Sequence, residues 1–225
     1  MRARQVSFLF DLDGTLVDSV YMHVLAWHEA LETEGIELSV WRIHRKIGMS
    51  GGLFTNMLLR ETGLAIDPER AERLRRLHAE AYKRRADRIR PLPGARELLS
   101  YLTEAGLPWA IATSGRMETA GPVLATLGVD PGRVPVITRD KVKHAKPDPD
   151  LFLAAAEALS QPIEGACVVG DSIWDMLAAR RAGGLGVGLL SGGYGEDELV
   201  RASAYRVYED PADLLKHIDE VGGRG

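Results

Sequence analysis

The sequence contains a single cysteine, Cys167, so no disulfide bond can form within the chain. A lone thiol in an apolar run is typical of a reducing compartment, and we expect a cytoplasmic protein. No apolar run approaches the ~20 residues that cross a bilayer, so the sequence does not predict a membrane protein. The formal net charge is only -4, and this weak balance predicts neither a nucleic-acid nor a membrane partner.

What the sequence does contain is a globular pattern without internal repeats or low-complexity segments. Hydrophobic residues make up 45% of it, which suffices for a sizeable core. Short apolar runs predict strands at residues 6–10, 109–113, 134–138, 166–169, 185–190 and 205–207. Helical patterns separate the strands after residue 94. This alternation predicts an α/β fold, a Rossmann-like doubly wound parallel sheet with right-handed crossovers.

Residues 18–90 interrupt the alternation directly after the first predicted strand. Their apolar spacing predicts helices alone, and the block is large enough to bury a small core of its own. The prolines and the glycine of residues 91–94 break any helix and indicate a linker. We therefore expect a core domain of residues 1–17 and 91–225, with an inserted all-helical domain of residues 18–90.

Two aspartates, Asp11 and Asp13, end the first predicted strand in the segment DLDGT. The carboxyl end of a strand is where open α/β sheets bind ligands. Two neighbouring anions repel each other unless a cation lies between them, and Mg²⁺ is a hard divalent ion that favours oxygen ligands. One carboxylate oxygen would remain free to act as a nucleophile. The alternative is that both residues belong to a turn that caps the next helix.

Three further polar clusters follow predicted strands. Thr113 and Ser114 offer hydroxyl and N–H groups to an anionic oxygen, although such a segment is also a common loop. Lys146 lies in a stretch stiffened by prolines and supplies a fixed positive charge, unless it is a solvated loop lysine. Asp171 and Asp175 lie one helical turn apart and would complete a metal site with the first motif. The alternative for this pair is an N-cap and a surface acid.

The order of these motifs resembles the four motifs of the haloacid dehalogenase superfamily, in its phosphatase branch. The motifs are DLDGT, Thr113-Ser114, Lys146-Pro147 and GDSIWD. The resemblance covers the core from residue 6 to about residue 190, and it is specific because four motifs agree in type and in order. The helical insertion after the first motif resembles the subclass I cap, as in phosphoglycolate phosphatases and β-phosphoglucomutases.

The resemblance implies a Mg²⁺-dependent phosphatase that hydrolyses a small-molecule phosphate monoester. Asp11 would be the nucleophile that forms an aspartyl-phosphate, and Asp13 would be the general acid and then the general base. Lys146 would neutralise charge between the phosphate and the nucleophile. The dehalogenases of the superfamily lack an acid at the place of Asp13, so dehalogenation is not expected.

The same resemblance implies which residues bind the metal and the substrate. The implied metal ligands are all aspartates: Asp11, Asp13 through its backbone carbonyl, Asp171, and Asp175 through water or an indirect contact. The implied phosphate-binding and substrate-binding residues come from separate loops: Leu12, Thr113, Ser114, Lys146 and Ser50. We expect the partner to be a small phosphorylated metabolite and the protein to be a monomer or a weak homodimer.

Two features of the insertion bear on the reaction. Residues 47–52, which include Ser50, resemble the substrate-facing turn of subclass I caps and equally resemble a plain interhelical turn. In this turn Gly51 replaces the arginine that grips a second phosphate in β-phosphoglucomutases, which favours hydrolysis. His23 and Trp27 match the mutase hinge, so a β-phosphoglucomutase-like isomerase is an alternative, unless His23 is an ordinary helix histidine. A non-catalytic phosphometabolite-binding protein is the alternative of another class.

Overall fold

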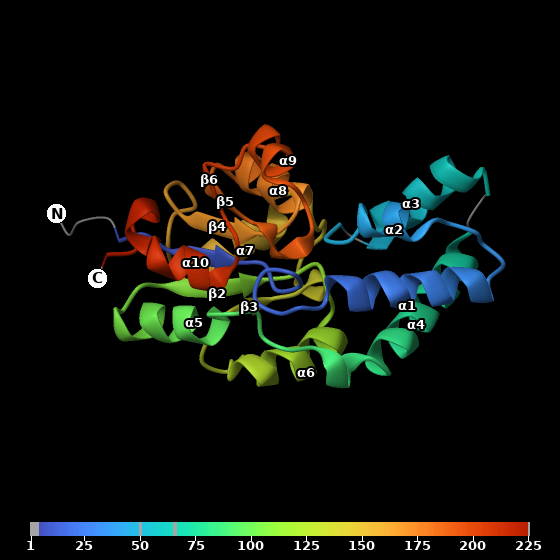
Figure 1. Ribbon diagram of the computed structural model, residues 1–225, viewed down its shortest axis with the longest axis horizontal. Coiled ribbons are helices and arrows are strands. Elements are labelled where there is room, and N and C mark those ends of the chain that lie inside the picture. Colours follow the sequence, from blue (N-terminus) through green and yellow to red (C-terminus); the bar gives the residue numbers. More distant parts are fainter. Residues whose placement is uncertain (1–4, 50, 65–66, 225) are drawn as a thin grey trace.

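The computed structural model describes residues 5–49, 51–64 and 67–224 (Figure 1). Within these ranges, six parallel strands form one sheet in the order β3-β2-β1-β4-β5-β6. The strands are β1 Phe8–Phe10, β2 Trp109–Ala112, β3 Val136–Ile137, β4 Cys167–Gly170, β5 Leu185–Leu189 and β6 Arg206–Tyr208. The strand order reverses between β1 and β4, and this switch point is where doubly wound sheets bind ligands.

Helices cover both faces of the sheet. They are α5 Ala95–Glu104, α6 Met117–Leu127, α7 Asp150–Ala158, α8 Ile173–Ala182, α9 Glu196–Arg201 and α10 Pro211–Lys216. Side chains alternate along β1, so Phe8 and Phe10 pack with α5, α6 and α10 on one face. Leu9 packs with α7 and α8 on the other face. The predicted doubly wound α/β fold is therefore confirmed.

Four more helices follow β1 and lie beyond one end of the sheet, on the right of Figure 1. They are α1 Val20–Thr33, α2 Val40–His44, α3 Gly51–Thr62 and α4 Pro68–Lys83. These helices bury an apolar cluster of their own, which includes Trp27, Phe54 and Leu74. A separate cluster is what a separately packed insertion requires, and the division into two domains remains a prediction.

Short 3-10 segments complete the fold: η1 Ala86–Arg88, η2 Arg139–Lys141, η3 Leu190–Gly192 and η4 Ile218–Val221. The segments η2 and η3 follow β3 and β5, so they lie at the same edge of the sheet as the motif loops. Among the described helices, none combines the length and the apolar character needed to cross a bilayer.

Candidate active site

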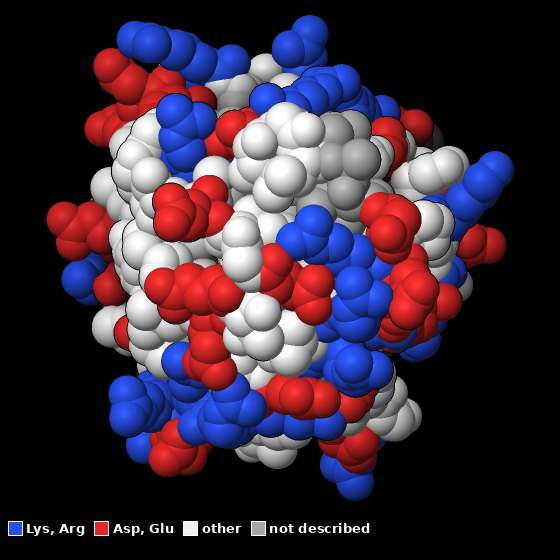
Figure 2. Space-filling view, turned by 90° about the vertical axis from the view of Figure 1, so that its right-hand side faces the viewer, with Lys and Arg blue, Asp and Glu red and all other residues white. Residues whose placement is uncertain are grey.

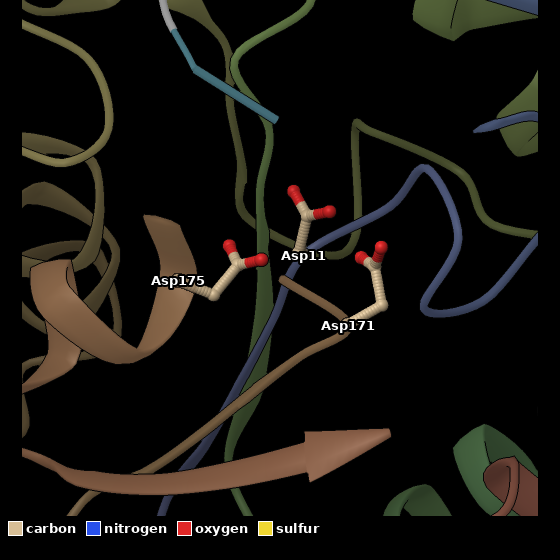
Figure 3. Close-up of side chains that lie close together, drawn as sticks. All are labelled: Asp11, Asp171 and Asp175. Carbon is tan, nitrogen blue, oxygen red and sulfur yellow. The ribbon is translucent and has the colours of Figure 1, made fainter. Parts of the chain in front are cut away.

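Three carboxylates converge at the carboxyl ends of β1 and β4. Asp11 follows β1, Asp171 follows β4, and Asp175 lies in the first turn of α8. One oxygen atom from each residue lies within 4.8 Å of the other two, and all three side chains are buried. Figure 3 shows Asp11 between the other two aspartates. The motifs DLDGT and GDSIWD thus meet in one acidic cluster, as their strand-end positions predict.

Glycines on two sides make room for Asp171. Gly14 has a φ of +85°, and a Cβ at this position would lie 2.6 Å from Oδ2 of Asp171. A Cβ on Gly192 would lie 1.7 Å from the same oxygen. Thr15 donates a 2.9 Å hydrogen bond to Oδ1 of Asp171. The first motif therefore needs its glycine for a close approach, and its threonine orients the carboxylate of the other motif.

Asp175 is part of a capping box at the start of α8. The hydroxyl of Ser172 donates to Oδ2 of Asp175, and the N–H of Ser172 donates to the same atom over 3.1 Å. The N-cap is Ser172 and not Asp171, and Asp175 is 0% exposed, so the alternative of an N-cap and a surface acid is wrong for this pair. The local helix signal and the acidic cluster therefore use the same side chain.

Lys146 is a buried cation that joins two of these carboxylates. Its ammonium group contacts Oδ1 of Asp11 and lies 2.8 Å from Oδ1 of Asp175. The residue is 0% exposed, so the alternative of a solvated loop lysine is wrong. Burial works to lower the pKa of Lys146, but the charges of Asp11 and Asp175 outweigh burial and raise that pKa. Lys146 therefore remains positively charged.

The cluster holds more negative charge than Lys146 balances. Burial, with repulsion from Asp175 and Asp13, raises the pKa of Asp11 to about 7 against the opposing effect of Lys146. Burial, with the charges of Asp175 and Asp11, also raises the pKa of Asp171 well above its usual value. A divalent cation among hard oxygen ligands would supply the missing positive charge. The donor set therefore fits a metal ion, as the sequence predicts.

Asp13 has different surroundings from Asp11. Its Oδ1 accepts a 2.6 Å hydrogen bond from the hydroxyl of Ser19 and lies 3.2 Å from Nε2 of His23. Burial works to raise the pKa of Asp13, but His23 and Ser19 together outweigh burial and lower it. Ser19 occupies the N-cap position of α1, yet its hydroxyl binds Asp13 instead of capping the helix. The two aspartates of one motif are thus electrostatically distinct.

The loop after β2 carries Thr113 and Ser114 to the same edge of the sheet. Oγ1 of the buried Thr113 accepts a 2.9 Å hydrogen bond from the N–H of Gly115, which closes the loop. The hydroxyl of Ser114 donates a 2.9 Å hydrogen bond to the carbonyl of Gly48, in the connection between α2 and α3. The predicted phosphate loop therefore contacts the helical insertion directly.

Leu12 and Ser50 are the remaining predicted binding residues. The side chain of Leu12 is fully buried in the apolar cluster beside the sheet, so only its main chain is suited to contact a phosphate. Its carbonyl accepts a 2.9 Å hydrogen bond from the N–H of Leu16 and shapes the turn after β1. Ser50 lies outside the described residues, and its predicted substrate contact stays a prediction.

A cavity of about 530 Å³ lies in front of Asp11 and Asp13. Its wall on the sheet side includes these two aspartates and residues 113–116, and its wall on the helical side includes Trp27 and His78. Small-molecule sites commonly enclose about 300–1,000 Å³, so the space suits a small metabolite. The acidic cluster thus opens onto a cavity between the sheet and the helical insertion.

His78 of α4 is a site residue that the sequence did not indicate. Its Nε2 lies 3.1 Å from Nδ1 of His23, and its ring stacks on Trp27 with centroids 4.2 Å apart. Burial, with the charge of His23, lowers the pKa of His78 well below its usual value. A histidine in a helix rich in arginine gives no local signal. Only the packing of α4 beside α1 brings His78 to the cavity.

The fold and the site together define a class: doubly wound α/β enzymes with an acidic centre at the strand ends and a buried lysine beside it. The family model described as haloacid dehalogenase-like hydrolase matches residues 7–183 of this sequence. The chain therefore belongs to the haloacid dehalogenase-like hydrolase family.

Individual relatives agree with this family. Hexitol phosphatase A of Escherichia coli is 36% identical over 178 residues, which cover 78% of this chain and 79% of the relative. A phosphoglycolate phosphatase of Caulobacter vibrioides is 32% identical over 209 residues, which cover 92% and 88% of the two chains. The crystal structure of a hydrolase from Pseudomonas syringae is 59% identical, with a TM-score of 0.94, and the match covers 96% of this chain and 99% of that one. These likenesses confirm the predicted superfamily and the predicted phosphatase.

Proposed function

We propose that this phosphatase forms an aspartyl-phosphate on Asp11, with Mg²⁺ as its cofactor and a small phosphate monoester as its substrate. The position of Asp11 carries the proposal, because this residue lines the cavity, contacts Lys146 and shares an acidic cluster with Asp171. Phosphoryl transfer depends mainly on positioning and on charge neutralisation, and both are available at this position.

Asp11 and Asp171 would hold Mg²⁺ through carboxylate oxygens, together with the backbone carbonyl of Asp13. Asp175 already accepts hydrogen bonds from Ser172 and lies against Lys146, which suits a supporting role better than a direct ligand. Bound Mg²⁺ supplies positive charge that offsets the repulsion between the phosphate and Asp11.

The reaction then follows from the two aspartates of the first motif. A carboxylate oxygen of Asp11 attacks phosphorus, and the bond from phosphorus to the leaving oxygen breaks as the new bond forms. Asp13 donates a proton to that leaving oxygen and later accepts one from the water that hydrolyses the acyl phosphate. The contacts of Asp13 with Ser19 and His23 support this role, because they fix the direction of its carboxyl group.

The remaining phosphate contacts belong to the neighbouring loops. The hydroxyl of Thr113, the N–H of Ser114 and the main-chain N–H of Leu12 would bind phosphate oxygens, and Lys146 would balance their charge. The presence of Thr113 and Ser114 in the same cavity wall as Asp11 supports this assignment.

Residues 18–90 would act as a cap that closes the cavity and excludes water. Their separate apolar cluster and their share of the cavity wall support this role. A small phosphorylated metabolite fits the cavity volume, and the names hexitol phosphatase and phosphoglycolate phosphatase indicate such substrates for two relatives. We expect the enzyme to act as a monomer or a weak homodimer.

The direct test is hydrolysis of p-nitrophenyl phosphate as a function of Mg²⁺ concentration. We expect turnover that needs Mg²⁺, stops with EDTA and returns when excess Mg²⁺ is added. Turnover that is indifferent to EDTA would contradict the metal assignment. Tight phosphate binding without any Mg²⁺-stimulated turnover would instead favour a non-catalytic binding protein.

One contact favours a second candidate, a β-phosphoglucomutase-like isomerase. His23 lies beside Asp13, which is the arrangement that the resemblance to the mutase hinge implies. Formation of glucose 6-phosphate from β-glucose 1-phosphate would identify this activity. The sequence has Gly51 where the mutases have an arginine for the second phosphate, so we expect hydrolysis to predominate.

A further inference from the structure

The cavity wall contains a buried cation that the proposed phosphoryl transfer does not use. Lys46 follows α2, lines the cavity and is only 4% exposed. An ammonium group loses much of its hydration in such a place, so it needs polar partners. Among the described residues, its ion-pair partner is Glu61 of α3, whose carboxylate contacts Nζ of Lys46.

The carboxylate of Glu61 does not neutralise all the positive charge around it. The guanidinium of Arg42 donates a 2.8 Å hydrogen bond to Oε2 of Glu61, while Lys46 contacts Oε1. One carboxylate therefore serves two cations, and two positive charges against one negative charge leave a surplus of one positive charge. Arg42 is 44% exposed and is not among the described residues that line the cavity. Lys46 is thus the member of this cluster at the cavity.

The outer part of the cavity also has more positively charged than negatively charged side chains. Its charged lining residues are three arginines and two carboxylates: Arg75, Arg116, Arg139, Glu118 and Asp140. Glu118 already contacts Lys83, Asp140 lies 3.7 Å from Arg116, and Arg75 lies 2.8 Å from Glu72, so the surplus positive charge is that of Arg139. Figure 2 shows that the outer face of the insertion mixes both charge signs, so its surface as a whole does not select for anions. Any such selection must come from groups inside the cavity.

We propose that Lys46 binds a second anionic group, a carboxylate or a phosphate, at the end of the substrate remote from the cleaved phosphate. This inference rests on the proposed function, because it takes the cleaved phosphate to lie at Asp11. The hydroxyl of Ser114 binds the carbonyl of Gly48, two residues after Lys46, so the phosphate loop and the Lys46 turn are tied together. An ammonium group has three N–H donors, of which the contact with Oε1 of Glu61 uses one, and it binds an anion more strongly than a neutral hydroxyl.

The test compares kcat/KM for matched pairs of substrates. One pair, 3-phosphoglycerate and glycerol 3-phosphate, differs by a carboxylate against a hydroxymethyl group. The other pair, glucose 1,6-bisphosphate and glucose 6-phosphate, differs by a second phosphate. The wild-type enzyme is expected to prefer the doubly anionic member of at least one pair, and the pair that responds identifies the anion.

Three variants separate the effect of Lys46 from its surroundings. Lys46→Met is expected to lower the anionic-to-neutral ratio of kcat/KM by about tenfold, the size of one charge-assisted hydrogen bond. Glu61→Gln is expected to raise the ratio, because Lys46 then shares its charge with no carboxylate. Arg42→Met leaves the carboxylate of Glu61 to Lys46 alone, so the ratio is expected to fall as well, but by less than in Lys46→Met because the ammonium group is still present.

The outcomes distinguish this inference from the proposed function. If the wild type does not hydrolyse even p-nitrophenyl phosphate, the proposed function is wrong and this inference falls with it. If it hydrolyses that ester but shows no anion preference, or if Lys46→Met lowers both members of a pair equally, only this inference is wrong. Circular dichroism checks the fold of each variant. Should Lys46→Met not fold, Glu61→Gln decides, and a ratio that does not rise overturns the proposal.

Discussion

Lys146 contacts both Asp11 and Asp175. It therefore links the motif DLDGT, which contains Asp11, to the motif GDSIWD, which contains Asp175. The three residues are almost completely buried. Because Lys146 engages Oδ1 of Asp11, the other oxygen of that carboxylate is left for a metal ion or for an incoming phosphorus atom. One lysine therefore offsets part of the negative charge of Asp11, the proposed nucleophile, and holds one oxygen of its carboxylate in place.

Replacing Lys146 by methionine is expected to lower kcat for p-nitrophenyl phosphate by roughly 10²- to 10³-fold, the usual cost of losing one preorganised electrostatic contact. The change also leaves two buried carboxylates without their cation, so we expect a loss of about 3–5 kcal/mol in the free energy of unfolding. Urea denaturation measures the second effect. Lys143→Met removes an exposed lysine three residues away and is expected to change neither quantity. Equal activity in the two variants would contradict the role of Lys146.

Replacing Asp13 by asparagine removes the proposed proton donor and keeps the size of the side chain. A poor leaving group needs that proton, so its kcat/KM, which covers only the steps up to departure of the leaving group, is expected to fall by about 10²- to 10⁴-fold. The fall in kcat/KM is expected to be much smaller for p-nitrophenyl phosphate, whose leaving group departs without protonation. The measurement is a plot of log(kcat/KM) against leaving-group pKa for both enzymes. Parallel lines would rule out Asp13 as the acid.

Replacing Asp171 by asparagine is expected to weaken metal binding without unfolding the protein. The acidic cluster keeps its shape but loses one negative ligand, so more Mg²⁺ is needed for half-maximal activity and the thermal shift on adding Mg²⁺ shrinks. Asp197→Asn, at an aspartate whose side chain is 87% exposed, is the matched control. An unchanged Mg²⁺ requirement in Asp171→Asn would place the metal elsewhere.

Cys167 is expected to be inert in the folded protein. Its thiol is 1% exposed and lies 3.1 Å from the carbonyl of Val221, and burial raises its pKa to about 12. The thiolate is the reactive form, so little of it exists at about pH 8. Ellman's reagent should leave the native protein unmodified and titrate a single thiol after denaturation. Rapid reaction of the native protein would show that the interior of the sheet opens easily.

The sequence was sufficient for the sheet and for the acidic cluster. Each motif follows a short apolar run, and parallel strands bring their carboxyl ends to one edge, so Asp11 and Asp171 could be expected to meet. The order of helices and strands after residue 94 carried most of the information about the fold.

Contacts between the insertion and the sheet could not be predicted in this way. Ser19 stands at the N-cap position of α1, but the folded chain brings its hydroxyl to Asp13. His78 lies in the basic helix α4, and Lys46 lies in the turn after α2. The local sequence of each segment is typical of solvated surface. The two residues reach the cavity because α2 and α4 both pack against α1, and such packing depends on residues far apart in the chain. Secondary-structure propensity of the local sequence does not predict that packing.

The central claim is that Asp11 becomes phosphorylated during turnover. Rapid acid quench after mixing the enzyme with a substrate labelled in its phosphate group, followed by peptide mapping, measures this directly. We predict a covalent label on the peptide that contains Asp11 in the wild type and in Asp18→Asn, an exposed aspartate of the same segment. Asp11→Asn should fold, acquire no label and show no turnover. A labelled or active Asp11→Asn enzyme would contradict the account.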